Sequence, residues 1–231
     1  MDGLPNIARV GALIGDPVRV AMLGALMDGC EHPAGELAGI SGIAPQTASG
    51  HLSKLLDGGL LAATRRGRHR YFRLKDSEVA HAIEILSVAA SLGAAPPPRV
   101  PPDLRLARRC YDHVAGKLGV VICRALIASE HVVAGGPGYT LSASGRQWAS
   151  DVGLANAGTS RRPLVRSCLD WTERQPHLAG WLGHAIYQRL EAEHAIRVST
   201  TSRALRLEPR APALLRQMFG VHWPTCVAAP A

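Results

Sequence analysis

The sequence has few aromatic residues and no long apolar run. Aromatic side chains make up 4% of its 231 residues, and no stretch approaches the roughly 18 uninterrupted apolar residues of a membrane-spanning helix. The first residues lack the basic and apolar segments of a secretion signal. The five cysteines are odd in number and form no CxxC pair. These absences predict a cytoplasmic protein with reduced thiols, and they argue against a disulfide scaffold, a secreted domain or a membrane protein.

The sequence also lacks a catalytic or cofactor-binding motif. Its ten histidines are scattered without the spacing of a nucleophile and a base. The glycine-rich stretch at 135–138 is not followed by the Lys-Ser/Thr pair of a phosphate-binding loop. We therefore expect a protein that is not an enzyme, with no catalytic residues and no cofactor.

Charged residues are fewer than average, but their distribution is uneven. They make up 19% of the chain, against roughly 25% in typical proteins. Hydrophobic residues make up 47%, enough for a folded core. Residues 1–95 carry nine basic and nine acidic side chains, so the whole net charge of +8 falls after them. A basic surface favours a polyanionic partner, either nucleic acid or a membrane surface.

A proline-rich stretch divides the chain. Five prolines fall in 94–102, where they cannot continue a helix and favour a stiff, extended connector. The sequence therefore predicts an N-terminal domain over 1–94, a linker over 95–102, a C-terminal domain over 103–222 and a frayed tail over 223–231. No internal repeat at a fixed period is evident.

The N-terminal domain has the pattern of a winged helix-turn-helix. A helix over 33–40, a tight turn and a helix that begins at Pro45 are followed by two strands over 60–74. Gly67 joins the strands, since glycine adopts the positive φ that a tight hairpin needs. We therefore predict a mainly α protein with small β-hairpin wings, whose second helix enters the major groove of double-stranded DNA.

Polar side chains on that helix and arginines on the hairpin are the candidate DNA contacts. Glutamine can pair with adenine through two hydrogen bonds, and serine or threonine can contact a base or a phosphate. Arginines at a hairpin tip can neutralise phosphates or enter the minor groove. The alternative, a solvated basic hairpin on an ordinary helical domain, does not explain why turn, helix and hairpin occur in this order. The candidate residues are Gln46, Thr47, Ser49, Gly50, His51, Lys54, Arg65, Arg66 and Arg68.

Four segments of this domain resemble the ArsR/SmtB family of bacterial repressors. They are IGDPVR at 14–19, APQTASGHLSKL at 44–55, GLL at 59–61 and GRHRYF at 67–72. The resemblance covers about residues 5–92. It implies a homodimer that blocks a promoter and releases it when an effector binds. The C-terminal part, with RCYDH at 109–113, is similar to a longer subfamily with an added domain.

Physical reasoning also favours a homodimer. One recognition helix covers only a few base pairs, whereas two helices related by a two-fold axis bind half-sites one helical turn apart. The apolar faces of the helices predicted over 7–14 and 76–92 offer the contact surface.

The C-terminal domain is predicted to be helical and in part winged-helix-like. We expect helices over 104–128, 143–152, 163–173, 177–193 and 209–219, a strand over 139–141 and a hairpin over 196–207. Its aromatic side chains are either core residues or the lining of a pocket for a small organic effector. The candidate effector-binding residues are Trp148, Trp171, Trp181 and Tyr187.

Metal sensing is an alternative. The sequence lacks the thiolate and Asp-x-His patterns that metal sensors of the resembling family use. Two weaker clusters remain, Cys30 with His32, and Cys110 with His113 on one turn of an expected helix. Cys110 falls on an apolar stripe, where a free cysteine usually packs.

The sequence therefore predicts a homodimeric, sequence-specific repressor that a small organic molecule releases from its operator. Three alternatives stay open besides metal sensing. They are a thiol switch, a constitutive architectural DNA-binding protein, and a module whose C-terminal domain docks a protein partner.

Overall fold

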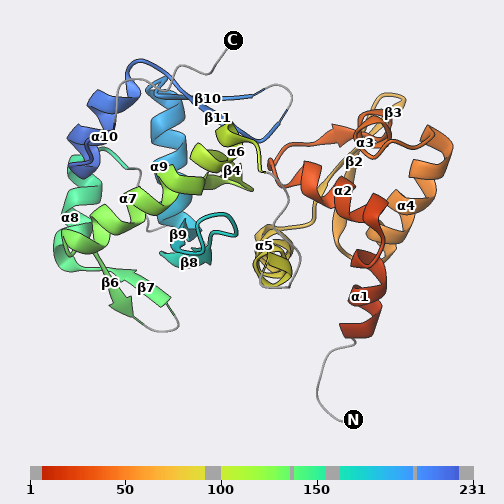
Figure 1. Ribbon diagram of the computed structural model, residues 1–231, viewed down its shortest axis with the longest axis horizontal. Helices are drawn as coiled ribbons and strands as arrows, with labels where there is room; N and C mark the ends of the chain where they lie inside the picture. Colours follow the sequence, from red (N-terminus) through yellow and green to blue (C-terminus); the bar gives the residue numbers. More distant parts are fainter. Residues whose placement is uncertain (1–6, 92–99, 136–137, 155–161, 200–201, 224–231) are drawn as a thin grey trace. The chain divides into compact units, whose positions relative to one another are not determined.

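The computed structural model describes residues 7–91, 100–135, 138–154, 162–199 and 202–223 (Figure 1). Two compact units make up the chain, Met1–Ile83 and Glu84–Ala231. Their division falls inside helix α5 (Ser77–Ser91). Within the described ranges, no helix is long and apolar enough to cross a membrane.

The division into units precedes the proline-rich stretch at 95–102, where sequence analysis places the domain boundary. Residues 92–99 and 224–231 lie outside the described residues. The linker over 95–102 and the tail over 223–231 therefore stay predictions.

The N-terminal unit contains a helix-turn-helix followed by a hairpin. Strands β1, β3 and β2 form one antiparallel sheet in that order, with Leu61 opposite Leu74 and Arg66 opposite His69. Before α5, its elements are α1 (Ile7–Ile14), α2 (Pro17–Leu26), β1 (His32–Pro33), α3 (Ala34–Ile40), α4 (Pro45–Asp57), β2 (Leu61–Arg66) and β3 (His69–Leu74).

Local sequence signals set the helix ends in this unit. The Asp16 carboxylate accepts a hydrogen bond from the backbone N–H of Arg19 at 3.0 Å, and Pro17 occupies the first helical position. These two residues start α2. Apolar residues at helical spacing then bury one face of each following helix. The fully buried members of this core include Met22, Leu26, Leu37, Leu52, Leu55 and Leu74.

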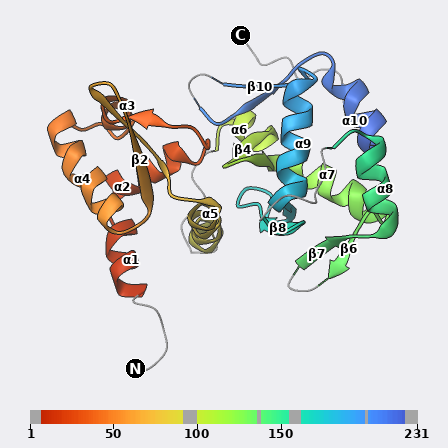
Figure 2. The same cartoon turned by 180° about the vertical axis from the view of Figure 1, so that it is seen from behind.

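The C-terminal unit alternates short hairpins with helices (Figure 2). The hairpins are β4–β5, β6–β7, β8–β9 and β10–β11, each a separate two-stranded antiparallel sheet. After α5 the elements are α6 (Pro102–Leu106), β4 (Arg108–Cys110), β5 (His113–Ala115), α7 (Gly116–Ala128), β6 (Val132–Gly135), β7 (Gly138–Leu141), α8 (Ala143–Asp151), β8 (Arg166–Leu169), β9 (Pro176–Ala179), α9 (Gly180–Ala192), β10 (Ile196–Val198), β11 (Leu205–Leu207) and α10 (Ala211–Phe219).

This unit is an internal duplication, contrary to the sequence-based expectation. The order hairpin, helix, hairpin, helix occurs twice. The first helices, α7 and α9, each have 13 residues, and the last helices, α8 and α10, each have 9. The sequence His-(Val/Leu)-Ala-Gly-x-Leu-Gly begins at His113 and again at His177, 64 residues later. The second repeat has a longer turn before its histidine, so its cysteine does not stand at the same spacing from the shared motif as Cys110 does.

The two repeats pack reciprocally. Helix α7 of the first packs against β9 of the second, and α9 of the second packs against β5 of the first. Gly119 and Gly183 lie against the strand that precedes them in their own repeat and close to the histidine of the other repeat. A Cβ at Gly119 would collide with the Val114 carbonyl oxygen and lie 3.4 Å from the Cβ of His177. At Gly183 it would collide with the Leu178 carbonyl oxygen.

The structure corrects two helices predicted for this unit. Residues 104–128 contain α6, the β4–β5 hairpin and α7 rather than one long helix. The predicted helix over 163–173 is instead β8 and its turn, and 177–179 belong to β9. Cys110 and His113 therefore lie opposite each other across a hairpin, not on one helix turn.

The predicted fold class is confirmed: the chain is mainly helical with small hairpins. The strand at 139–141 and the hairpin within 196–207 also form as predicted. The Ser142 hydroxyl accepts a hydrogen bond from the Gly145 N–H at 2.9 Å and so starts α8.

Candidate DNA-binding site

Helices α3 and α4 form the helix-turn-helix. A tight turn over 41–44 separates them, and Gly42 adopts a φ of 66° there. The backbone N–H of Ile43 closes the turn on the Ala38 carbonyl at 3.1 Å. Ala48, Leu52 and Leu55 are buried and fix α4 to the unit. This buried stripe determines which face of α4 points outward.

The outward face of α4 carries most of the candidate base-contacting residues. Their side chains offer amide, hydroxyl and ammonium groups, which are the groups that pair with base edges and phosphates. The Ser49 hydroxyl donates to the Pro45 carbonyl of its own helix at 3.1 Å. The exposed residues of this face are Gln46, Thr47, Ser49, Gly50 and Lys54.

His51 differs from the other candidates on α4, because it is half-buried. Its Nδ1 atom lies 3.8 Å from Oδ1 of Asp16, the residue that caps α2. The hydrogen bond from the Arg19 N–H is the main reason that the pKa of Asp16 is lowered, and the charges of Arg19 and His51 act in the same direction. His51 thus lies beside the start of α2, and a base contact by it stays a prediction.

The β2–β3 hairpin forms the wing. Arg65 pairs with Arg70 and Arg66 with His69, and Gly67 makes the turn with a φ of 59°. All four of these side chains are exposed, as is Arg68. Like charges that face each other across a hairpin repel. An anionic partner would offset this repulsion, so the concentration of arginines favours such a partner.

Glu31 anchors the base of the wing, a contact that sequence analysis did not identify. Its carboxylate accepts a hydrogen bond from Thr64 Oγ1 at 2.7 Å and one from Arg66 at 2.5 Å. The Arg66 guanidinium also lies over the Tyr71 ring, 5.2 Å from its centre. Arg66 is therefore held in place, and no local sequence signal links residues so far apart in the chain.

His32 is engaged in ion pairs. Its Nε2 lies 2.7 Å from Asp28 and its Nδ1 lies 2.9 Å from Glu36. The hydrogen bond to Asp28 is the main cause that raises the pKa of His32 to about 9, with support from Glu36 and against the opposing effect of burial. Both ring nitrogens of His32 are thus engaged by carboxylates. Cys30 is exposed, and its sulfur lies 3.9 Å from the Asp28 carbonyl oxygen.

The candidate effector residues lie in different parts of the C-terminal unit. Trp148, Trp181 and Tyr187 belong to its hydrophobic core. The Trp148 indole N–H donates to the Met218 carbonyl at 2.8 Å. Trp171 lies outside that core, under the Arg108 guanidinium at 5.1 Å. The structure does not gather these four side chains into one described pocket.

A helix-turn-helix with an outward polar face and an arginine-rich wing defines a winged helix-turn-helix DNA-binding protein. The chain belongs to the ArsR family of HTH-type transcriptional regulators, which are not enzymes. It is similar to the HTH-type transcriptional regulator YdfF of Bacillus subtilis (strain 168), with 42% identity over 209 residues, 88% of this chain and 92% of the relative. That likeness includes the C-terminal unit.

Shorter relatives match the N-terminal unit. The HTH-type transcriptional regulator CmtR of Mycobacterium bovis is 39% identical over 87 residues, 37% of this chain and 73% of the relative. Among solved structures, the homodimeric winged helix-turn-helix domain of Mb0332 from Mycobacterium bovis, a possible ArsR-family regulator, has a TM-score of 0.36 and 29% identity, over 41% of this chain and 94% of that one. No protein-family model matches the chain.

Proposed function

We propose that the chain is a homodimeric, cytoplasmic repressor that reads its operator with α4 and holds the DNA backbone with the wing. The observation that carries the proposal is the exposed polar face of α4, followed in the same unit by the arginine-rich hairpin. Gln46, Thr47 and Ser49 contact bases or the adjacent phosphates, and Gly50 lets the helix backbone approach the groove. Lys54, Arg65, Arg66 and Arg68 neutralise phosphates, and His51 contacts the DNA from its place on α4 beside Asp16, the cap of α2.

Exposed apolar side chains support self-association. Helix α1 buries none of its residues within the chain, and its Ile7 and Val10 are 62% and 39% exposed. Helix α5 exposes Ile85 and Leu86 at 49% and 45%. Such apolar side chains gain free energy when a second copy covers them. A two-fold dimer would then present two α4 helices to two half-sites.

We propose that an effector releases the dimer from DNA by binding more tightly to a conformation that cannot bind DNA. The C-terminal unit is the part of the chain that we propose binds the effector. A cavity of about 10 Å³ lies between the repeats, next to Val114 and Leu178. It has room for one water molecule, so an organic effector would have to bind elsewhere or open the unit. The class of effector therefore stays a prediction from the sequence.

A reporter experiment tests the repressor role. The DNA upstream of the protein's own gene drives the reporter in cells that lack the gene, and the gene is then restored. We expect expression to fall on restoration, and Gln46→Ala to abolish the fall without loss of the protein. Unchanged expression would contradict repression at this site, and a rise would indicate an activator.

A further inference from the structure

Two cysteines and two histidines meet where the repeats of the C-terminal unit join. We call them the repeat-junction cluster: Cys110, His113, Cys168 and His177. Their ligand atoms all lie within 4.8 Å of one another, and all four residues are buried. The first repeat contributes one cysteine and one histidine from β4 and β5, and the second contributes the equivalent pair from β8 and β9. Sequence analysis identified only the first pair.

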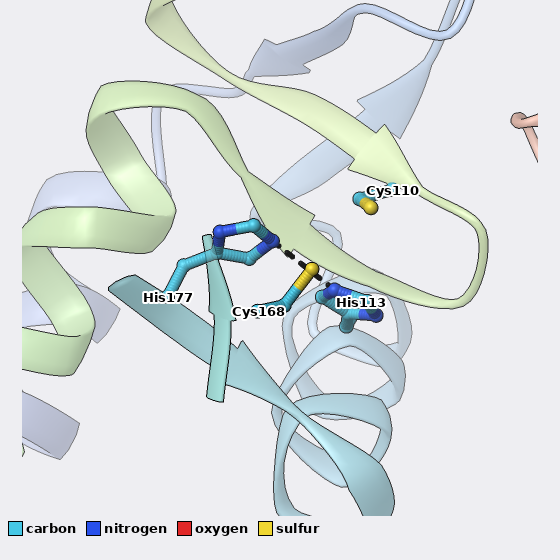
Figure 3. A group of neighbouring side chains, drawn as sticks. All are labelled: Cys110, His113, Cys168 and His177. Atoms are coloured by element: carbon cyan, nitrogen blue, oxygen red, sulfur yellow. Dashed lines mark hydrogen bonds between the residues drawn. The ribbon is translucent and has the colours of Figure 1, made fainter. Parts of the chain in front are cut away.

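The two histidines face each other within this cluster (Figure 3). The Nε2 atoms of His113 and His177 lie 3.1 Å apart. Each histidine has an aspartate near its other nitrogen. Asp112 lies 3.2 Å from Nδ1 of His113, and Asp170 lies 3.8 Å from Nδ1 of His177. Metal-binding histidines commonly have a carboxylate near the nitrogen that does not bind the metal, which leaves the other nitrogen, here Nε2, to coordinate the ion. In the metal-free protein the two Nε2 atoms share one hydrogen bond, and a metal ion bound between them would replace its proton.

We propose that the repeat-junction cluster binds one zinc-class divalent metal ion with tetrahedral geometry. Two thiolates and two imidazoles are a ligand set that zinc prefers, and the aspartates behind the histidines match the second layer of such sites. At a Zn–N distance of about 2.0–2.1 Å, a tetrahedral ion sets two imidazole nitrogens about 3.3–3.4 Å apart. The observed 3.1 Å is close to this value.

Burial determines the kind of metal site. Cys110 and Cys168 are 1% exposed, and His177 is fully buried. A closed site with four protein ligands leaves no position for a substrate, which is the arrangement of structural rather than catalytic zinc. Since the ligands come equally from both repeats, the ion ties the repeats together. This site is separate from the proposed DNA contacts and does not depend on them.

A neighbouring acidic cluster is a weaker candidate. Glu84 and Asp170 also lie near His177. However, the Arg108 guanidinium already pairs with Glu84 at 3.1 Å and with Asp170 at 2.9 Å. Asp170 also accepts hydrogen bonds from the backbone N–H groups of Gly116 and Thr172. A metal ion at these carboxylates would therefore have to compete with the Arg108 guanidinium.

Metal binding is tested on the full-length protein, purified with reductant. Zinc content is measured by elemental analysis, and the metal-free protein is titrated with Co²⁺ and followed by absorption. We expect one metal ion per chain, intense visible bands of tetrahedral Co²⁺ and a sulfur-to-cobalt charge-transfer band. Cys168→Ser and His177→Ala should lose tight binding. The matched control Cys123→Ser, at a buried cysteine outside the cluster, should retain it.

Three results would overturn the proposal. One is reduced wild-type protein that takes up no Co²⁺ and contains no zinc. Another is a cobalt spectrum without tetrahedral intensity or sulfur charge transfer. The third is a metal ion that Cys168→Ser and His177→Ala retain but Cys30→Ser loses. Where a cluster variant fails to fold, the wild-type stoichiometry and spectrum still decide the question.

Discussion

His113 and His177 occupy equivalent positions in two repeats, 64 residues apart in sequence, and their Nε2 atoms lie 3.1 Å apart in the fold. Each stands on the second strand of a hairpin, and each hairpin packs against the helix of the other repeat. A duplicated sequence thus places one copy of each side chain at a shared centre. The chain therefore has two kinds of unit. The N-terminal unit is a DNA-binding unit of a known family, and the C-terminal unit is duplicated and carries a candidate metal centre.

Arg68→Ala should weaken binding to every DNA sequence by a similar factor. Arg68 is exposed at the tip of the wing, and loss of one phosphate contact lowers the slope of log K against log salt by about 1. Fluorescence anisotropy over a salt series measures this slope. The control is Arg216→Ala on α10 of the C-terminal unit, also exposed. A slope that is unchanged in Arg68→Ala would remove Arg68 from the interface.

Gln46→Ala should instead reduce discrimination between sequences. A bidentate pair between glutamine and adenine contributes about 1–3 kcal/mol of preference for the correct base. The affinity for the operator should fall by that amount, while the affinity for random DNA stays nearly constant. The same substitution at exposed Gln188 on α9 is the control. Equal losses on both DNAs would show that Gln46 does not read a base.

Ile7→Asp should disrupt the dimer. Ile7 is 62% exposed on α1, and a carboxylate buried in a dimer contact would lose its hydration without a partner. Sedimentation should detect monomer at concentrations where the wild type is dimeric, and operator binding should weaken with it. Ile127→Asp, at a 37% exposed site on α7, is the control. A dimer as stable as the wild type would place the interface elsewhere.

The ion pairs of His32 should stabilise the N-terminal unit in a pH-dependent way. The pKa of His32 is raised from 6.5 to about 9. The stabilisation is therefore fully present below about pH 6.5 and is lost as the pH rises through about 9. The difference in unfolding free energy between the wild type and His32→Gln should shrink over that range in urea titrations. A difference that is constant with pH would contradict the proposed charge on His32.

Gly119→Ala should destabilise the C-terminal unit, because the added Cβ meets the Val114 carbonyl and approaches His177. Overpacking of this kind costs about 1–3 kcal/mol. Gly24→Ala in α2 is the matched control, since a Cβ there meets nothing within 4 Å. That substitution should stabilise by about 0.5–1 kcal/mol through helix propensity. Thermal unfolding measures both, and an unaffected Gly119→Ala would contradict the close packing of α7 against β5.

The N-terminal unit could be predicted from sequence because its signals are local. Asp16 and Pro17 start α2, the turn glycine at 67 closes the wing, and helical spacing marks the buried stripe of α4. The ion pair between Glu31 and Arg66 joins residues 35 positions apart. No local pattern encodes such a contact.

The C-terminal unit was harder to predict for a physical reason. Leu106, Cys110, Val114 and Leu118 recur every four residues, which suits one face of a helix. The same spacing also places residues on one face of a strand, because four is a multiple of the strand period of two. The pattern therefore could not separate the β4–β5 hairpin from a helix. The partners of Cys110 and His113 come from the second repeat, where a longer turn separates Cys168 from His177.

The central claim is tested most directly by comparing two affinities at fixed salt. One is for the DNA upstream of the protein's own gene, and the other is for shuffled DNA of equal length. Fluorescence anisotropy with the full-length protein gives both affinities. A sequence-specific regulator should bind the upstream DNA at least about 1,000-fold more tightly than the shuffled DNA, and Gln46→Ala should narrow that ratio. Equal affinities for the two DNAs would contradict sequence reading by α4 at that site and favour an architectural DNA-binding protein.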